Sequence, residues 1–227
     1  DRGLSRRHIF KTVEKSLSRL KTDYIDIYYL HVYDDATHLE ESLHAFNDLI
    51  TQGKIHYLGA SNFAAWQVMK GQQISEKKHI QPMYNLLKRQ AESELLPMCQ
   101  AENIAVFPYN PLAGGLLTGK YHRETVDDAS TQYRINNNPR YRQRYGTNLA
   151  NRITEKFIHF CDEQKFNPIE LALSWVMHHP AVTAPLLGAR TQKQIQQCLK
   201  AIDFTLTDEL YKTVTNLSVT PASATDR

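Results

Sequence analysis

The residue His31 ends an apolar run in the stretch "DYIDIYYLHVYDD", and a polar, acidic segment follows it at once. An imidazole has a pKa near neutrality, so it can donate a hydrogen bond to a reacting group or carry a proton. A histidine at the end of a strand can also be a structural residue whose hydrogen bonds are satisfied. The residue alone leaves both interpretations open.

Further polar residues follow the next two apolar runs. Ser61 and Asn62 follow the second in "GASNF", and Gln81 stands at the third beside "PMYNLL". Serine and asparagine at this position can cap the helix that follows, or they can hydrogen-bond an amide ligand. Both roles can hold together.

A glycine-rich loop, "NPLAGGLLTGK", follows the fourth run. Gly114 and Gly115 would let the backbone approach an anion closely, and amide groups leading into a helix suit a pyrophosphate, although the spacing is neither the Rossmann nor the Walker pattern. "GARTQKQ" after the fifth run offers Arg190, whose guanidinium can bind a phosphate with two hydrogen bonds. Tyr109 is either a core aromatic residue or a platform for a flat ring.

Alternating strand and helix patterns position these residues. We expect strands at 25–30, 55–59, 80–84, 104–108 and 183–187. Apolar residues at three- and four-residue spacing predict helices between them, as in "HLEESLHAFNDLITQGK". This alternation is typical of parallel strands joined by helices, so the fold class is α/β, either a flavodoxin-like sheet or part of an eight-stranded barrel. In both, ligands bind at the carboxyl ends of the strands.

Composition indicates a single soluble domain. The chain has 227 residues, 41% hydrophobic residues and a formal net charge of +3, which by itself does not imply nucleic acid. No apolar run approaches the roughly 18 residues of a membrane span, so we expect a cytoplasmic protein with no membrane partner. The three cysteines lack metal-ligand spacing, and we expect no metal. The arginines and tyrosines of 133–152 could bind nucleic acid, but we favour a solvated lid or loop insertion, spanning 122–152.

Taken in order, the stretches "DIYYLH", "GKIHYLGASNF", "IQPMYNLLKR", "YNPLAGGLLTGKY" and "PLLGARTQKQI" resemble the aldo-keto reductases, closest to the bacterial, aryl-alcohol-dehydrogenase-like branch. The resemblance implies a (β/α)8 TIM barrel, of which this chain would cover about the helix before strand 4 through strand 8 and the C-terminal helices, as one domain over 1–227. It implies reduction of aldehydes and ketones by NADPH without a metal. His31 would then be the tetrad histidine that orients the substrate carbonyl.

The same resemblance implies the cofactor contacts. Ser61, Asn62 and Gln81 would bind the nicotinamide carboxamide, and Tyr109 would stack on its ring. The pyrophosphate would face Asn110, Pro111, Leu112, Gly114 and Gly115. The adenosine end would be held by Gly188, Ala189, Arg190, Gln194, Gln197 and Cys198, with Arg190 on the 2′-phosphate of NADP(H). Gln197 and Cys198 stand where relatives usually have Glu and Asn.

The resemblance places the tetrad tyrosine, aspartate and lysine on or after the first three strands, before residue 1. A barrel of roughly 250 residues would put about three βα units there. We therefore expect these 227 residues to be part of a longer enzyme and to be inactive alone. The alternative is a non-catalytic nucleotide-binding protein on the same fold, like the β subunits of potassium channels. A degenerate remnant without cofactor is a third. The substrate and the oligomeric state stay open.

Overall fold

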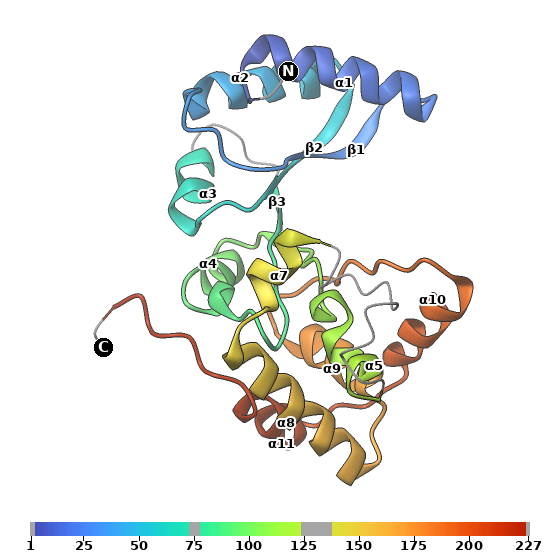
Figure 1. Ribbon diagram of the computed structural model, residues 1–227. Coiled ribbons are helices and arrows are strands. Elements are labelled where there is room, and N and C mark those ends of the chain that lie inside the picture. The colour runs from blue at the N-terminus through green and yellow to red at the C-terminus, as the bar shows by residue number, and fades with distance from the viewer. Residues whose placement is uncertain (1–2, 73–77, 124–137, 226–227) are drawn as a thin grey trace. The chain divides into compact units, whose positions relative to one another are not determined.

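The computed structural model describes residues 3–72, 78–123 and 138–225, and its chain divides into two compact units. The first unit consists of Asp1–Pro82 and Pro97–Phe107, and the second of Met83–Leu96 and Pro108–Arg227. Each unit is described by itself (Figure 1). The prediction of one domain over 1–227 stays a prediction.

A four-stranded parallel sheet forms the centre of the first unit. Its strands are β1 (Ile25–Leu30), β2 (Ile55–Ser61), β3 (Lys78–Gln81) and β4 (Ala105–Val106), in the order β1-β2-β3-β4. Register pairs Leu30 with Ala60 and Ser61 with Gln81, so the carboxyl ends of the first three strands lie along one edge. The α/β class with a parallel sheet is confirmed. Consecutive strand order is that of a barrel, since the flavodoxin order is 2-1-3-4-5.

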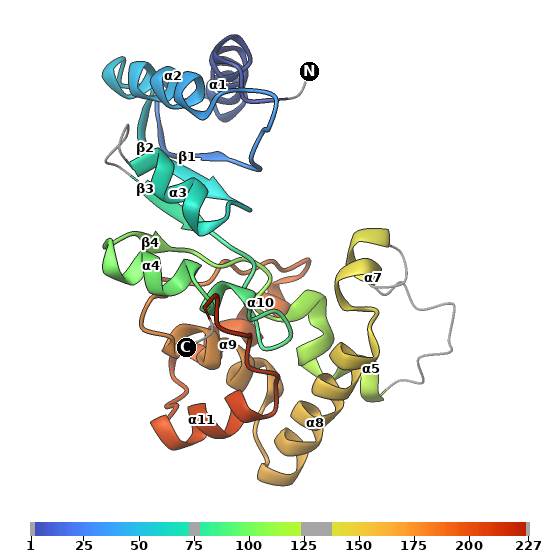
Figure 2. The ribbon, with the colours of Figure 1, turned by 90° about the vertical axis from the view of Figure 1, so that its left-hand side faces the viewer.

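Three helices pack against this sheet, namely α1 (Arg6–Leu20), α2 (Leu39–Thr51) and α3 (Ala65–Gln72). Figure 2 shows α1 and α2 together on one face of β1 and β2. The expected apolar face of α2 is buried at Leu39, Leu43 and Phe46. Ser5 occupies the N-cap position of α1 without a side-chain cap bond, and the Arg6 amide donates to Glu41 Oε1 instead (2.8 Å).

Prolines explain where the strands differ from expectation. β3 ends at Gln81, before Pro82, because proline has no amide hydrogen for the ladder. The expected strand at 183–187 is wrong. Its only strand-like pairing among the described residues is a parallel bridge between Tyr109 and Leu186, with the Leu186 amide donating to the Pro108 carbonyl (2.8 Å). Pro108 and Pro185 limit any longer ladder.

Helices surround a buried central helix in the second unit. That helix is α9 (Pro168–His178), which buries every residue from Leu171 to Val176 and so exposes no side over that stretch. Asn167 caps it, accepting from the Ile169 amide (2.9 Å). Its neighbours are η2 (Ala113–Thr118), α8 (Asn148–Gln164), α10 (Gln192–Leu199), η3 (Lys200–Ile202) and α11 (Asp208–Asn216).

The remaining helices are short: η1 (Gln90–Glu92), α4 (Leu95–Ala101), α5 (Lys120–Arg123) and α7 (Pro139–Tyr145). Part of the expected insertion at 122–152 is thus helical, since α7 and the start of α8 lie in it. Residues 124–137 of that insertion lie outside the described residues, and its role as an insertion over a site stays a prediction. No helix in the described ranges is long and apolar enough to cross a membrane.

Candidate functional site

Four of the predicted site residues meet at the carboxyl edge of the first unit's sheet. His31 follows β1, Ser61 ends β2 and Asn62 follows it, and Gln81 ends β3. The Asn62 side-chain amide donates to the His31 carbonyl (2.8 Å) and to Ser61 Oγ (3.0 Å). Ser61 Oγ in turn donates to the Gln81 carbonyl (2.8 Å). These bonds fix the backbone on which the His31 imidazole stands, and that side chain is exposed.

The asparagine at this edge adopts a left-handed conformation, with φ of 59° at Asn62. Asparagine is among the few residues that visit this region without a large penalty. Its side chain is turned toward the sheet edge, whereas the Ala64 amide before α3 donates to Gln67 Oε1 (2.9 Å). Gln81 also hydrogen-bonds Tyr29, which opposes the rise in the pKa of that tyrosine caused mainly by burial.

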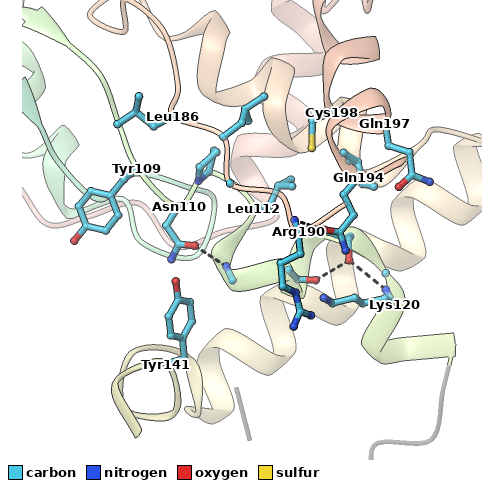
Figure 3. A pocket seen from close by; sticks show the side chains of 18 residues that line it. Tyr109, Asn110, Leu112, Lys120, Tyr141, Leu186, Arg190, Gln194, Gln197 and Cys198 are labelled. Carbon is cyan, nitrogen blue, oxygen red and sulfur yellow. Dashed lines mark hydrogen bonds between the residues drawn. The ribbon is translucent and has the colours of Figure 1, made fainter. Parts of the chain in front are cut away.

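A cavity of about 680 Å³ lies wholly in the second unit. That volume is within the range of roughly 300–1,000 Å³ common for small-molecule sites. Figure 3 shows its lining from the loop after β4, from α7 and from the start of α10. Its walls include all but one of the second-unit residues predicted for the cofactor: Tyr109, Asn110, Pro111, Leu112, Gly114, Gly115, Gly188, Arg190, Gln194, Gln197 and Cys198. Ala189 is the exception.

Tyr109 stands at one end of this cavity and is partly buried. Its backbone forms parallel β-bridges with Met83 and Leu186, and this pairing fixes the position of the ring. Burial raises the pKa of Tyr109, and the positive charge of Arg144 partly opposes that rise. A neutral, fixed phenol ring offers a face on which a flat ring can stack.

The glycine pair adopts backbone conformations that other residues avoid, with φ of 70° at Gly114 and 98° at Gly115. A Cβ on Gly114 would lie 2.6 Å from the Tyr141 ring, and one on Gly115 would lie 2.9 Å from Lys120 Cε and Nζ. Both amides are already used inside the loop. Gly114 donates to Asn110 Oδ1 (2.8 Å) and Gly115 to the Leu112 carbonyl (2.8 Å). The loop thus offers close approach, while the expected amide donors are engaged.

Positive charge comes instead from two side chains, Lys120 and Arg190, both of which line the cavity. Among the described lining residues there is no carboxylate. Two cations on its wall make the cavity attractive to an anion, and phosphate is the common biological one.

The Arg190 end of the cavity lies at the start of α10. Thr191 caps that helix, accepting from the Gln194 amide (3.2 Å), and Gln194 Oε1 accepts from the Arg190 amide (2.8 Å). The N-terminal end of a helix carries partial positive charge, which adds to that of the guanidinium. A Cβ at Gly188 would meet no atom within 4 Å, so open space remains above the chain there.

Cys198 and Gln197 close the same end of the cavity. Cys198 is buried, and burial raises the pKa of its thiol, which therefore behaves as a small apolar wall.

Sequence reasoning missed Lys120 and Tyr141 as lining residues. A basic residue directly after the glycine loop was an available signal for Lys120. The tyrosines of 133–152, in the expected loop insertion, were the available signal for Tyr141, which comes from α7 and points toward Asn110 in Figure 3.

The lining residues fit a dinucleotide. An elongated anion with ring systems at both ends matches a half-buried tyrosine, two cations and a helix start in one cavity. Within the described residues, no group of three or more histidines, cysteines, aspartates and glutamates could hold a metal ion.

Comparison with known proteins shows which family the chain resembles in sequence. Residues 1–219 match the sequence profile of the aldo/keto reductase family. The uncharacterized oxidoreductase YrpG of Bacillus subtilis (strain 168) is 35% identical over 230 residues, covering 99% of this chain and 68% of that protein. A protein of Arabidopsis thaliana described as "Probable voltage-gated potassium channel subunit beta" is 32% identical, covering 89% of this chain and 64% of its own.

A solved structure agrees with the sequence matches. The glycerol dehydrogenase AKR11B4 from Gluconobacter oxydans superposes with a TM-score of 0.81 and 29% identity, over 100% of this chain and 69% of its own. The chain thus spans about two thirds of the length of these relatives, from 64% to 69%. Because the family profile matches nearly the whole length of the chain, the chain belongs to the aldo/keto reductase family.

Proposed function

We propose that the second unit's cavity binds NADP(H) and that the protein reduces aldehydes and ketones to alcohols. The observation that carries the proposal is the cavity itself, with Tyr109 at one end and the cations Lys120 and Arg190 in its wall. A nucleotide with a pyrophosphate and a 2′-phosphate has the charge that such a lining favours.

The proposed positions of the cofactor follow the family resemblance. Tyr109 stacks on the nicotinamide, the pyrophosphate lies against the glycine pair beneath Lys120, and Arg190 binds the 2′-phosphate. In the first unit, Ser61, Asn62 and Gln81 hydrogen-bond the carboxamide. A stacked ring and a clamped amide fix which face of the nicotinamide is presented, and hydride transfer depends on that orientation.

His31 is proposed to donate a hydrogen bond to the substrate carbonyl. A donor aimed at this oxygen stabilises the negative charge that develops there during reduction. NADPH, when bound, supplies the hydride. The resemblance assigns the proton donor to a tyrosine that corresponds to none of these 227 residues, with a lysine and an aspartate beside it. We therefore expect turnover from a protein that carries all four residues and cofactor binding alone from this chain.

Arg190 provides the sharpest test of the cofactor. We expect Arg190→Gln to weaken NADPH binding by about 1.5–3 kcal/mol, the range for hydrogen bonds to charged groups, and to leave NADH binding nearly unchanged. Titration calorimetry with both dinucleotides measures this. The matched control is Arg152→Gln, since Arg152 is exposed on α8 and does not line the cavity. Equal losses for NADPH and NADH would show that Arg190 does not read the 2′-phosphate.

Enzymatic function is tested separately from binding. Oxidation of NADPH by 4-nitrobenzaldehyde, followed by absorbance, is expected from a protein with the complete tetrad, and aryl alcohols should be oxidised in reverse if the aryl-alcohol branch is right. The similarity to a channel β subunit makes a non-catalytic nucleotide-binding role the second candidate. NADPH binding without turnover of any carbonyl by the tetrad-containing protein would favour that role.

A further inference from the structure

Tyr145, the last residue of α7, carries a fully buried hydroxyl outside the cavity lining. Its oxygen accepts from the side-chain amides of Asn110 (2.5 Å) and Asn85 (3.1 Å), and its hydrogen is donated to the Met83 sulfur (3.4 Å). A phenol has one donor and two acceptor sites, so all are used. Burial raises the pKa of Tyr145 to about 12, which keeps the donated proton in place.

Asn110 connects this hydroxyl to the glycine loop. Its Oδ1 accepts from the Gly114 amide (2.8 Å), while its Nδ2 donates to Tyr145. Its carbonyl accepts from Asn85 Nδ2 (2.9 Å) and from the Ala113 amide (3.0 Å). Asn110 is thus held at both ends of its side chain and at its backbone, in a left-handed conformation with φ of 62°.

The loop that Asn110 begins is left-handed over most of its length, and Ala113 is its strained residue. Ala113, Gly114 and Gly115 follow one another with φ of 50°, 70° and 98°. A left-handed alanine is unfavourable, and such conformations persist only where the surroundings determine them. At the start of the loop, the hydrogen bonds of Asn110 hold the backbone in this conformation.

A second contact joins α7 to the same loop. The Tyr141 ring lies so close to Gly114 that a Cβ there would be 2.6 Å from it, and the Tyr141 and Tyr145 ring centroids are 6.2 Å apart. The helix α7 therefore covers Gly114 through Tyr141 and fixes Asn110 through Tyr145. A change that breaks the hydrogen bonds of Tyr145 would therefore alter the loop conformation at the proposed pyrophosphate site.

We propose that Tyr145 is a positioning residue for the nucleotide: through Asn110, its hydroxyl holds the loop 110–115 in the conformation that binds the pyrophosphate and so couples α7 to cofactor affinity. The inference rests on the proposed NADP(H) function. It assigns a role to a residue that touches neither the cavity nor, by the contacts above, the ligand.

The test compares two ligands on Tyr145→Phe, which removes the hydroxyl and keeps the ring. NADPH spans the glycine loop, whereas adenosine 2′-monophosphate has no pyrophosphate and reaches only the Arg190 end. We expect the variant to lose about tenfold in NADPH affinity, as for a buried hydrogen bond worth about 1.4 kcal/mol, with the 2′-AMP affinity unchanged within about twofold. Titration calorimetry gives both values.

The control is Tyr84→Phe, the same chemical change in the same unit. Tyr84 is also fully buried and donates to Glu92 Oε1 (2.8 Å), but it does not line the cavity. It should lose stability without losing NADPH affinity. Equal losses for both ligands in Tyr145→Phe, or no loss for either, would overturn the coupling alone. A wild-type protein that binds neither ligand would overturn the proposed function and the coupling with it.

A second variant keeps the test valid if Tyr145→Phe fails to fold. Asn110→Gly allows the left-handed backbone but removes the side-chain link, so it should lose NADPH affinity as Tyr145→Phe does. In the double variant, the second change should cost little more, because both act through one connection. Full NADPH affinity in Asn110→Gly, or additive losses in the double variant, would contradict a path through Asn110.

Discussion

At the scale of single residues, two glycines with the same φ allow the cost of backbone strain to be told from the cost of a steric clash. Gly53 and Gly114 both have φ of 70°, but a Cβ on Gly53 would meet nothing within 4 Å, while one on Gly114 would meet the Tyr141 ring at 2.6 Å. We expect Gly53→Ala to cost about 1 kcal/mol, the penalty of a left-handed alanine, and Gly114→Ala at least about 1–2 kcal/mol more. Urea unfolding of both variants measures the two costs.

The comparison also bears on the glycine loop as a binding element. If Gly114→Ala and Gly53→Ala lose equal stability, then Tyr141 moves aside easily and does not fix the loop. A difference between them would show that the ring and the glycine pack as a unit.

Some residues of the site can be predicted from the sequence next to them, whereas others depend on partners far away in the chain. His31, Ser61, Asn62 and Gln81 were placed at the sheet edge because each stands at or shortly after an apolar run, and parallel strands bring such positions together. Tyr145 gave no comparable signal. Its partner Asn110 is 35 residues away and Asn85 is 60 away, and no local pattern encodes such pairs.

At the scale of elements, a buried ion pair attaches the last helix to the second unit. Arg89 donates to both oxygens of Glu92 (2.8 Å each) and to the Thr215 carbonyl in α11 (3.1 Å). Trp175 Nε1 of α9 donates to Thr215 Oγ1 (2.8 Å). The side chains of Arg89 and Glu92 are only 5% and 18% exposed, so each charge is stabilised mainly by the other and little by water.

We expect Glu92→Gln to destabilise the protein by about 3 kcal/mol, because it leaves the Arg89 charge buried without its partner. The matched change is Glu163→Gln in the pair His159–Glu163, whose side chains are 74% and 57% exposed. Exposed pairs contribute about 0–1 kcal/mol, so that variant should unfold nearly as wild type does. Urea midpoints compare them, and equal shifts would mean that the Arg89 charge finds water or another partner.

Element boundaries were predictable where one residue type decides them. The apolar run of 25–30 became β1 with the expected bounds, and α9 begins where Asn167 caps it ahead of Pro168. The expected strands 80–84 and 183–187 overran Pro82 and Pro185, where the ladder lacks an amide hydrogen. The helix α7 inside the expected loop insertion begins at Pro139, and its cap is Asn138, whose side chain accepts from the Arg140 amide (3.0 Å).

At the scale of the whole chain, the two compact units each have a core of their own. Val13, Phe46 and Ile55 are buried in the first, and Phe157 and Trp175 in the second. The alternation of strands and helices predicted the α/β class but gave no sign of this division. It is set by which contacts form across long stretches of chain, as when Met83–Leu96 joins Pro108–Arg227.

Because the cavity lies wholly in the second unit, a ligand confined to the Arg190 end should stabilise that unit selectively. At a 2′-AMP concentration of about 100 times Kd, mass action adds about 2.7 kcal/mol to the unfolding free energy of whatever binds it. We expect the slowest-exchanging amides of the second unit to exchange about 100-fold more slowly, with those of the first unit unchanged.

Hydrogen exchange followed by mass spectrometry resolves the two sets of amides. Arg190→Gln at the same 2′-AMP concentration is the control, since it should remove the protection without altering either core. Equal protection of both units by 2′-AMP would mean that they unfold together, and the Arg190 end would then report on the stability of the entire chain. Selective protection would mean that the nucleotide cavity forms and opens with the second unit alone, so that α7, the glycine loop and α10 are stabilised together by the ligand.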